Sequence, residues 1–299
     1  MLVDKGLILE GGGMRAAYTA GVLDCFLDEK IYFENIYGVS AGVCHASSYV
    51  SQQKKRAIHV ITDFTDDKKY AGIKSLMTTG NFFGVKMIYD LIPNKLIPFD
   101  YHTFKKSPMN LYAVVTNCHT GQAEYPQVQD AKKDMIYIRA SSSLPLLAKM
   151  VYIKRVPYLD GGISDSIPLA HSIAAGNEKN VVVLTRPCDY KKNKDRLLPA
   201  LNIVYRNYPK LIEAIATRHL RYNDTLKFIK DEEKKGTAFV IQPAKPLEIG
   251  RIENNREKLW ELYQLGYNDA QKKMPELKRF ITKKQRFKLF NFLKNILNK

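Results

Sequence analysis

The sequence has few cysteines and no long apolar run, and both shortages narrow the class of protein. Its four cysteines, spread from Cys25 to Cys188, form no Cys-x-x-Cys pair, so we expect reduced thiols rather than a disulfide framework. No run of about 18 or more apolar residues occurs, so we expect no transmembrane helix. The first residues also lack the apolar stretch and cleavage site of a signal peptide. These absences favour a cytoplasmic protein, either free or peripheral at a membrane.

Cofactor motifs are missing as well. The sequence has no His-x-x-x-His pair and no carboxylate cluster with metal-ligand spacing, so we expect no metal. The glycines at 11–13 do not complete a dinucleotide fingerprint, because position 16 is Ala16, and no Gly-Lys-Ser/Thr follows them. We therefore expect no cofactor.

Acidic residues are scarce relative to basic ones. The chain has 47 Lys and Arg against 30 Asp and Glu, which gives a formal net charge of +17. Such a chain is attracted to nucleic acid or to anionic lipid. No zinc-finger or RNA-binding motif supports a nucleic-acid partner, so none is expected.

Residues 277–299 concentrate this charge, with eight Lys or Arg and no acid. On a helix their apolar residues recur at spacings of three, four and seven, which suits a helix lying on an anionic membrane surface. The alternative is an amphipathic helix that packs on its own domain. No pattern in the sequence specifies an oligomeric state.

The order of apolar segments predicts an α/β layered sheet. Strand, turn and helix follow one another twice within the first fifty residues. Residues 180–185 form the strongest buried-strand pattern, and the remainder is mostly helical, with long helices over 208–235 and from 254 or 255 to about 273. We expect a hydrolase domain over 6–172, a C-terminal part over 173–276 that packs on it or continues it, and a basic tail over 277–299.

Ser40 lies in a Gly-x-Ser-x-Gly pentapeptide between a predicted strand and a predicted helix. The pentapeptide runs from Gly38 to Gly42. At such a corner a strained turn exposes the serine hydroxyl, and the glycines leave room where side chains would collide. Three fixed positions are a weak signal alone, and a plain tight turn is the alternative. The strand before the motif and the helix after it favour a nucleophile.

A second glycine-rich turn precedes it. Gly11, Gly12 and Gly13 lie between a strand and a helix and offer free backbone N–H groups for an oxyanion. Arg15 adds positive charge close by, either for function or as part of a structural ion pair.

A serine nucleophile needs a base. Of the six histidines only His171 and His219 come late in the chain, and neither has a supporting motif. Asp160 is the better candidate, because it ends an extended segment and is followed by Gly161 and Gly162. A partly desolvated carboxylate within hydrogen-bond reach can accept the serine proton.

These motifs together resemble the patatin-like phospholipase family. Their order and spacing match: Glu-Gly-Gly-Gly-Met-Arg at 10–15, Gly-Val-Ser-Ala-Gly at 38–42 and Asp-Gly-Gly at 160–162. Ala-Ser-Ser-Ser-Leu-Pro at 140–145 is similar to the small-residue segment that lines the family's site. One position departs, since the family commonly has glycine where this chain has Ala16.

The resemblance implies a three-layer α/β/α sandwich with a mostly parallel central sheet. It implies a metal-free lipid acyl hydrolase with a Ser40–Asp160 dyad, and an oxyanion hole formed by the N–H groups of Gly11, Gly12, Gly13 and Ala41. The substrate would be a lipid or another acyl ester, and residues 70–100 are a hypothesis for an acyl pocket or lid. Two alternatives stay open: a soluble carboxylesterase with little lipid preference, and a non-catalytic basic protein that binds membrane or nucleic acid.

Overall fold

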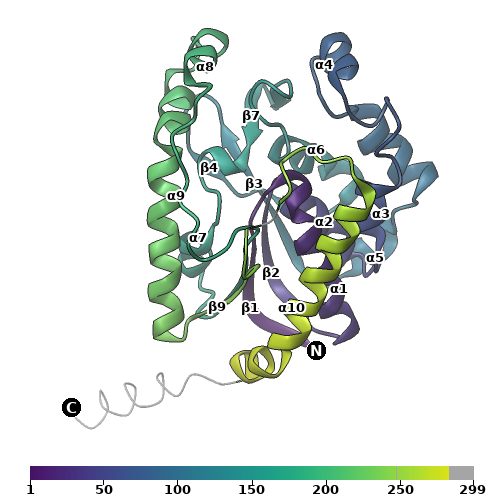
Figure 1. Ribbon diagram of the computed structural model, residues 1–299, viewed down its shortest axis with the longest axis vertical. Helices are drawn as coiled ribbons and strands as arrows, with labels where there is room; N and C mark the ends of the chain where they lie inside the picture. Colours follow the sequence, from purple (N-terminus) through teal and green to yellow (C-terminus); the bar gives the residue numbers. More distant parts are fainter. Residues whose placement is uncertain (247, 283–299) are drawn as a thin grey trace.

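The computed structural model describes residues 1–246 and 248–282. Within them, one nine-stranded sheet has the order β6-β7-β3-β2-β1-β8-β9, with β4 and β5 also paired to β3 (Figure 1). The strands are β1 (Leu2–Leu9), β2 (Tyr32–Val39), β3 (Asn110–Asn117), β4 (Ala123–Glu124), β5 (Gln127–Val128), β6 (Val151–Ile153), β7 (Val156–Asp160), β8 (Asn180–Val183) and β9 (Ala238–Ile241).

The centre of this sheet is parallel. Strands β3, β2, β1, β8 and β9 pair in parallel, whereas β4, β5, β6 and β7 form the antiparallel side next to β3. The predicted α/β class with a mostly parallel sheet is confirmed. Strand β2 begins at Tyr32, earlier than the apolar run from Ile36 predicts, because its first residues pair with Leu2 and Val3.

Helices surround the sheet. They are α1 (Ala17–Asp28), α2 (Ala41–Val50), α3 (Arg56–Thr62), α4 (Ile73–Thr79), α5 (Tyr101–Lys106), α6 (Ala131–Ser141), α7 (Leu169–Ala174), α8 (Leu198–Val204), α9 (Pro209–Lys235) and α10 (Arg256–Thr282). Two short 3-10 turns, η1 (Gly13–Ala16) and η3 (Gly161–Ile163), and a π-helix, η2 (Met87–Leu96), complete the described elements.

Successive side chains of a strand are buried against different helices, and this shows which helices cover each face of the sheet. In β1, Leu7 and Leu9 are buried in the core that includes α1, α2 and α10, whereas Ile8 is buried in a second core with α9. Successive side chains of a strand point to opposite faces, so the sheet is covered on both sides. Figure 1 shows α9 on one side of the sheet and α1 with α10 on the other.

Helices α1 and α10 approach closely at two glycines. A Cβ atom at Gly21 would come within 1.9 Å of the Tyr263 carbonyl oxygen, and one at Gly266 within 2.0 Å of the Tyr18 carbonyl oxygen. Only glycine permits this approach of two backbones. The Tyr18 hydroxyl also donates to Asp269 at 2.9 Å. The C-terminal helix is thus packed tightly onto the first helix of the chain.

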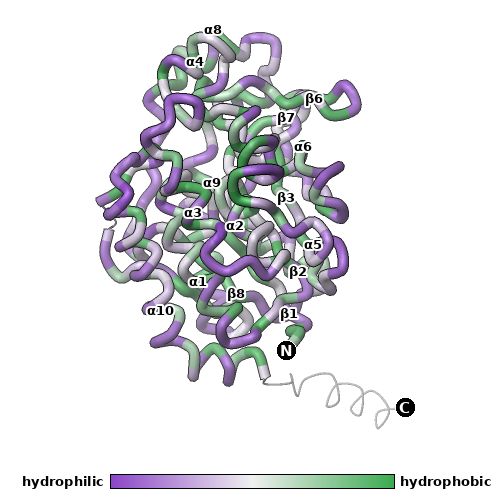
Figure 2. The backbone as a smooth tube through the Cα atoms, turned by 90° about the vertical axis from the view of Figure 1, so that its right-hand side faces the viewer, coloured by the Kyte–Doolittle hydropathy of each residue, from purple (hydrophilic) through white to green (hydrophobic). Residues whose placement is uncertain are grey.

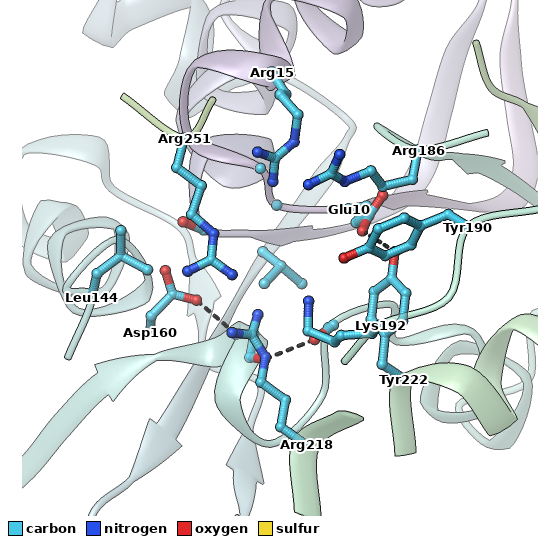
Figure 3. A pocket seen from close by; sticks show the side chains of 17 residues that line it. Glu10, Arg15, Leu144, Asp160, Arg186, Tyr190, Lys192, Arg218, Tyr222 and Arg251 are labelled. Atoms are coloured by element: carbon cyan, nitrogen blue, oxygen red, sulfur yellow. Dashed lines mark hydrogen bonds between the residues drawn. The ribbon is translucent and has the colours of Figure 1, made fainter. Parts of the chain in front are cut away.

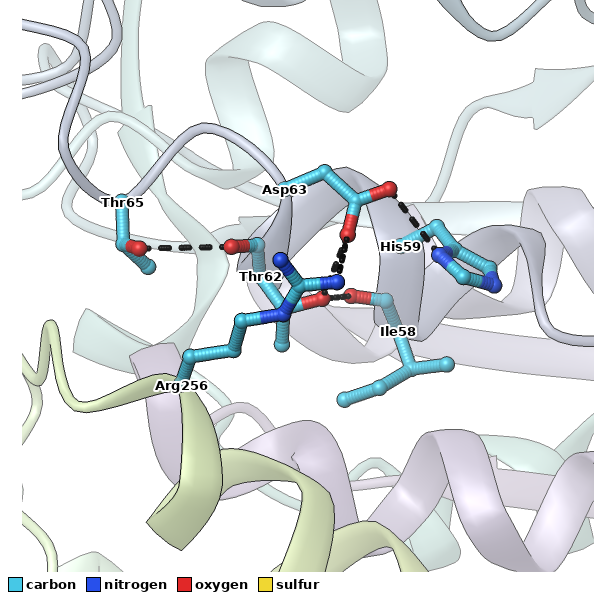
Figure 4. A network of polar contacts seen from close by, with 6 residues as sticks. All are labelled: Ile58, His59, Thr62, Asp63, Thr65 and Arg256. Carbon is cyan, nitrogen blue, oxygen red and sulfur yellow. Dashed lines mark hydrogen bonds and ion pairs between the residues drawn. The ribbon is translucent and has the colours of Figure 1, made fainter.

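The start of α10 is also anchored. The Arg256 guanidinium pairs with Asp63 at 3.1 Å, and His59 contacts the other carboxylate oxygen of Asp63 (Figure 4). The Asn255 side chain caps the helix by accepting from the Lys258 N–H at 3.0 Å. This anchoring holds the loop before α10, which carries Arg251, at the carboxyl end of the sheet.

The C-terminal end of α10 lies at the opposite end of the sheet. The prediction that this helix ends near 273 was wrong, because Leu277 and Ile281 are buried and continue its apolar stripe. In Figure 2, hydrophobic and hydrophilic segments alternate along α10. Residues 277–282 therefore pack on the domain. The rest of the predicted basic tail, 283–299, lies outside the described residues. No described helix has the length and apolarity to cross a bilayer.

Candidate active site

Ser40 lies at the corner between β2 and α2, at the carboxyl end of the parallel strands. Its backbone has φ 53° and ψ −126°, an unusual conformation for a non-glycine residue. Gly38 permits the corner, since a Cβ there would come within 2.5 Å of the Val43 Cα. A strained serine between a strand and a helix is the geometry of a nucleophile elbow, and only 8% of Ser40 is exposed.

Asp160 ends β7 and lies in the same cavity as Ser40. Its side chain is held on one side only: Oδ1 accepts from the Gly162 N–H at 2.7 Å. The other oxygen, Oδ2, is buried and has no hydrogen-bond partner of standard geometry. One carboxylate oxygen is thus fixed and the other is free to take a proton.

The environment of Asp160 favours its neutral form. Burial raises the pKa of this carboxyl, while the nearby Ser40 hydroxyl and the Arg218 charge act in the opposite direction. The two side chains make no hydrogen bond of standard geometry. Catalytic hydrogen bonds are often long in the absence of substrate.

The serine-rich segment 140–145 connects the two residues. Ser141 Oγ accepts from the Ser40 N–H at 2.9 Å, and the Ser143 carbonyl accepts from the Asp160 N–H at 2.9 Å. Leu144 lines the cavity. The segment thus fixes the backbone at both Ser40 and Asp160.

The glycine turn at 11–13 lies directly beside Ser40. A Cβ at Gly11 would come within 2.8 Å of the Ser40 Cβ, so only glycine fits. In the described part of the chain, the N–H groups of Gly11, Gly12, Gly13 and Ala41 have no hydrogen-bond acceptor. Gly42 lets α2 begin against β1, since a Cβ there would lie 2.7 Å from the Leu9 carbonyl oxygen.

Glu10 and Arg15 flank this turn and behave differently. The Glu10 carboxylate is fully engaged, accepting from the Thr185 N–H at 2.7 Å and from the Tyr222 hydroxyl at 2.6 Å. Arg15 is 6% exposed and lines the cavity, with its buried Nε unpartnered. Ala16 has helical angles, φ −71° and ψ 0°, so its methyl group fits where the family commonly has glycine.

Four cations that no motif predicts complete the cavity. Arg186, Lys192, Arg218 and Arg251 line it together with Arg15. Figure 3 shows their charged groups pointing toward one another, with Asp160 beside Arg251 and Arg218 and with Tyr190 and Tyr222 on the side of Arg186 and Lys192. They come from the β8–α8 loop, from α9 and from the loop before α10. The high net charge was the only sequence signal for them.

An apolar cavity of about 160 Å³ adjoins this polar one. Leu144, Asp160, Arg218 and Arg251 line both. The remaining walls are largely apolar and include Pro145, Leu146, Leu147, Ile163, Leu197, Leu201 and Ile215. Residues 70–100 contribute nothing to this cavity. Some of them instead line a smaller cavity of about 20 Å³ that shares Leu144 and Leu147 with it.

The histidines lie elsewhere. None of the six, all within the described residues, lines the cavity around Ser40. His171 stacks on Tyr125 with ring centroids 3.5 Å apart. His219 lines an adjoining polar cavity, which shares Lys192, Arg218 and Arg251 with the one around Ser40. In the described part of the chain, no three His, Cys, Asp or Glu side chains are grouped to hold a metal.

A buried serine at a strand–helix corner and a carboxylate beside it, at the carboxyl edge of a parallel sheet, are typical of α/β ester hydrolases. The chain belongs to the patatin-like phospholipase family, because the model of that family, Patatin-like phospholipase, matches residues 7–173. Membership supports a lipid ester hydrolase. A second model, Domain of unknown function (DUF6363), matches residues 208–282.

Three individual proteins are similar to this chain. The Uncharacterized protein YjjU of Escherichia coli is 27% identical, covering 87% of this chain and 74% of that protein. Lysophospholipase nte1 of Aspergillus niger is 26% identical over 92% of this chain, which spans only 18% of that protein. Among solved structures, VipD from Legionella pneumophila aligns with a TM-score of 0.46 at 14% identity, covering 91% of this chain and 67% of VipD.

Proposed function

We propose that this protein is a lipid acyl hydrolase of the phospholipase A or lysophospholipase type. Ser40 is the nucleophile, Asp160 is its general base, and the N–H groups of Gly11, Gly12, Gly13 and Ala41 form the oxyanion hole. The observation that carries the proposal is the strained Ser40 beside the unpartnered Oδ2 of Asp160 in one cavity.

The reaction needs two steps. Ser40 Oγ attacks the ester carbonyl carbon while Asp160 Oδ2 takes the hydroxyl proton, and the carbonyl oxygen becomes an oxyanion that the glycine turn stabilises. The tetrahedral intermediate collapses, the C–O bond breaks, and Asp160 returns the proton to the leaving alcohol. Water, deprotonated by Asp160, then attacks the acyl-serine; the bond between the acyl carbon and Ser40 Oγ breaks, Asp160 returns the proton to Ser40 Oγ, and the fatty acid leaves.

The apolar cavity supports an acyl substrate. A cavity of about 160 Å³ is close to the size that binds a benzene-sized hydrocarbon, so it accommodates the carbonyl-proximal part of an acyl chain. Because it adjoins Asp160, a chain bound there directs its ester toward Ser40. This arrangement favours a lipid hydrolase over a carboxylesterase with little lipid preference.

We also propose that 6–172 and 173–276 act as one hydrolase unit. Strands β8 and β9 extend the sheet of the N-terminal part, and Arg218 and Arg251 bring the C-terminal part into the cavity of Ser40.

Mass spectrometry of lipid products tests the proposal. Wild type is expected to release free fatty acid from phospholipid or lysophospholipid, whereas Ser40→Ala and Asp160→Asn release none above background. Equal release by wild type and Ser40→Ala would reject it. Cleavage of short soluble esters alone would favour the carboxylesterase.

A further inference from the structure

The cavity around Ser40 has far more positive charge than its own chemistry requires. Five cationic side chains line it, against only two carboxylates, Glu10 and Asp160. A Ser-Asp dyad and a backbone oxyanion hole need no such group of cations. The surplus indicates a ligand that carries negative charge into the site.

These cations have no directly bonded partner in the protein. In the described part of the chain, none of the side chains of Arg15, Arg186, Lys192, Arg218 and Arg251 has a hydrogen bond or an ion pair with a protein acceptor. Glu10 attracts Arg15 and Lys192 at longer range, but its oxygens accept their hydrogen bonds from Thr185 and Tyr222. The Nε atoms of Arg15 and Arg218 are buried without a partner, and such groups are rare in folded proteins.

Burial and mutual repulsion both make the charged forms of these side chains less favourable. Burial together with Arg186 and Arg251 lowers the pKa of Arg15 to about 10. Burial together with Arg218 and Arg251 lowers the pKa of Lys192 to about 7. Like charges gathered in a partly buried site are unfavourable, and an anionic ligand would relieve that cost.

Two aromatic rings hold the cations in position without neutralising them. The Arg186 guanidinium lies 4.5 Å from the Tyr190 ring centroid, and the Lys192 ammonium lies 4.5 Å from that of Tyr222. Cation–π contacts orient such groups and leave their N–H donors free. On the opposite side, Arg218 packs over Gly162, where a Cβ would come within 3.0 Å of its Nη2. The donors are thus preorganised around one space.

We propose that Arg15, Arg186, Lys192, Arg218 and Arg251 form a binding site for an anionic phosphate, so that the enzyme selects acyl esters with a net negative head group. This inference rests on the proposed function of Ser40 and Asp160. The apolar cavity takes the acyl chain, the ester lies at Ser40, and the phosphate lies among the cations. A head group that carries an ammonium is disfavoured, because its positive charge would meet theirs.

Binding to the inactive Ser40→Ala protein tests this without turnover. We would titrate it with three monomeric short-chain ligands that share one acyl chain: lysophosphatidylglycerol, lysophosphatidylcholine and monoacylglycerol. We expect the anionic lipid to bind about tenfold or more tightly than either of the others, as for one charge-assisted hydrogen bond. Equal binding of all three would overturn the proposal. Inorganic phosphate binding as tightly as the lipid would also overturn it, since the site would then hold free phosphate.

Variants that each remove one positive charge test which side chains form the site. Lys192→Gln and Arg251→Gln, each in the Ser40→Ala background, should abolish most of the preference for lysophosphatidylglycerol. Arg251 is an exposed loop residue, so its replacement should fold even if a change at a more buried position does not. Lys272→Gln is the matched control, because Lys272 is an exposed residue of α10 that lines neither this cavity nor those adjoining it. An unchanged preference in both variants, or an equal loss in the control, would contradict the assignment.

The two proposals fail in different ways. If wild type hydrolyses anionic, zwitterionic and uncharged esters at equal kcat/KM, the phosphate site is wrong and the hydrolase stands. If selective binding persists but no ester is cleaved, the hydrolase is wrong and the phosphate site stands.

Discussion

Gly11 lies so close to Ser40 that a Cβ added to the glycine would come within 2.8 Å of the serine Cβ. The same added atom would lie 2.9 Å from the Val39 carbonyl oxygen. The glycine turn and the nucleophile corner therefore form one rigid unit, in which neither backbone can move without the other.

Gly11→Ala should therefore inactivate the enzyme without unfolding it. The methyl group forces Ser40 and the turn apart, and a displacement of this kind costs about 10²-fold in rate. Overpacking should lower the free energy of unfolding by about 1–3 kcal/mol. Ester hydrolysis and thermal unfolding of the purified variant measure the two effects. Near wild-type activity would show that the close packing of Gly11 against Ser40 is not required for catalysis.

The acid limb of the pH profile should lie above the ordinary carboxyl range. Asp160 accepts a proton only when ionised, and burial raises its pKa. As the pH falls, Asp160 is therefore protonated earlier than an exposed aspartate, whose pKa is about 3.9, and kcat/KM falls with it. The measurement is kcat/KM of wild type against pH with an uncharged ester, alongside circular dichroism to exclude acid unfolding. A constant rate down to about pH 4 would contradict this role.

A separate basic limb should appear with anionic substrates. Burial, reinforced by repulsion from Arg218 and Arg251, lowers the pKa of the Lys192 ammonium to about 7, although Glu10 attracts it. Lys192 is thus charged below about pH 7 and neutral above it, so KM for lysophosphatidylglycerol should rise about tenfold across that pH.

The phosphodiester keeps its charge over this range, so the change reports on the protein. The rise should be absent for monoacylglycerol and should disappear in Lys192→Gln. The same rise in KM in Lys192→Gln would show that a group other than Lys192 causes it.

Filling the apolar cavity should shorten the preferred acyl chain. Leu197 lines this cavity yet is 58% exposed, so Leu197→Trp should fold. Each methylene excluded costs about 0.8 kcal/mol, and the loss of two should lower kcat/KM for long-chain relative to short-chain lysolipids by about tenfold. Ile203→Trp is the matched control, because Ile203 belongs to the adjoining α8, is 75% exposed and lies outside the cavity. Equal chain-length profiles in both variants would refute the acyl assignment.

Much of the hydrolase core could be predicted because its signals are local. Strand, turn and helix around Ser40 depend on neighbouring residues, and α9 lies close to the predicted range 208–235. The hydrogen bond between Ser141 and the Ser40 N–H could not be predicted, because it joins segments about a hundred residues apart. It depends on how α6 packs against the sheet.

The cations were beyond prediction for a related reason. Arg186, Lys192, Arg218 and Arg251 occur in no shared motif, and only the order of strands and the anchoring of α10 bring them to one cavity. In a chain with 47 Lys and Arg, four of them carry no distinguishing pattern. The extension of α10 beyond Pro275 was missed because tertiary burial of Leu277 and Ile281 outweighs the unfavourable effect of an internal proline.

Labelling with a fluorophosphonate tests the central claim, the Ser40–Asp160 dyad, most directly. The probe reacts only with an activated serine, and peptide mass spectrometry locates the adduct without knowledge of the natural substrate. We predict one adduct, on Ser40, in the wild-type protein, none in Ser40→Ala, and labelling slower by about 10²-fold or more in folded Asp160→Asn, as expected when a general base is removed. An unmodified Ser40 in the folded wild type, or equal labelling of wild type and Ser40→Ala, would contradict the account.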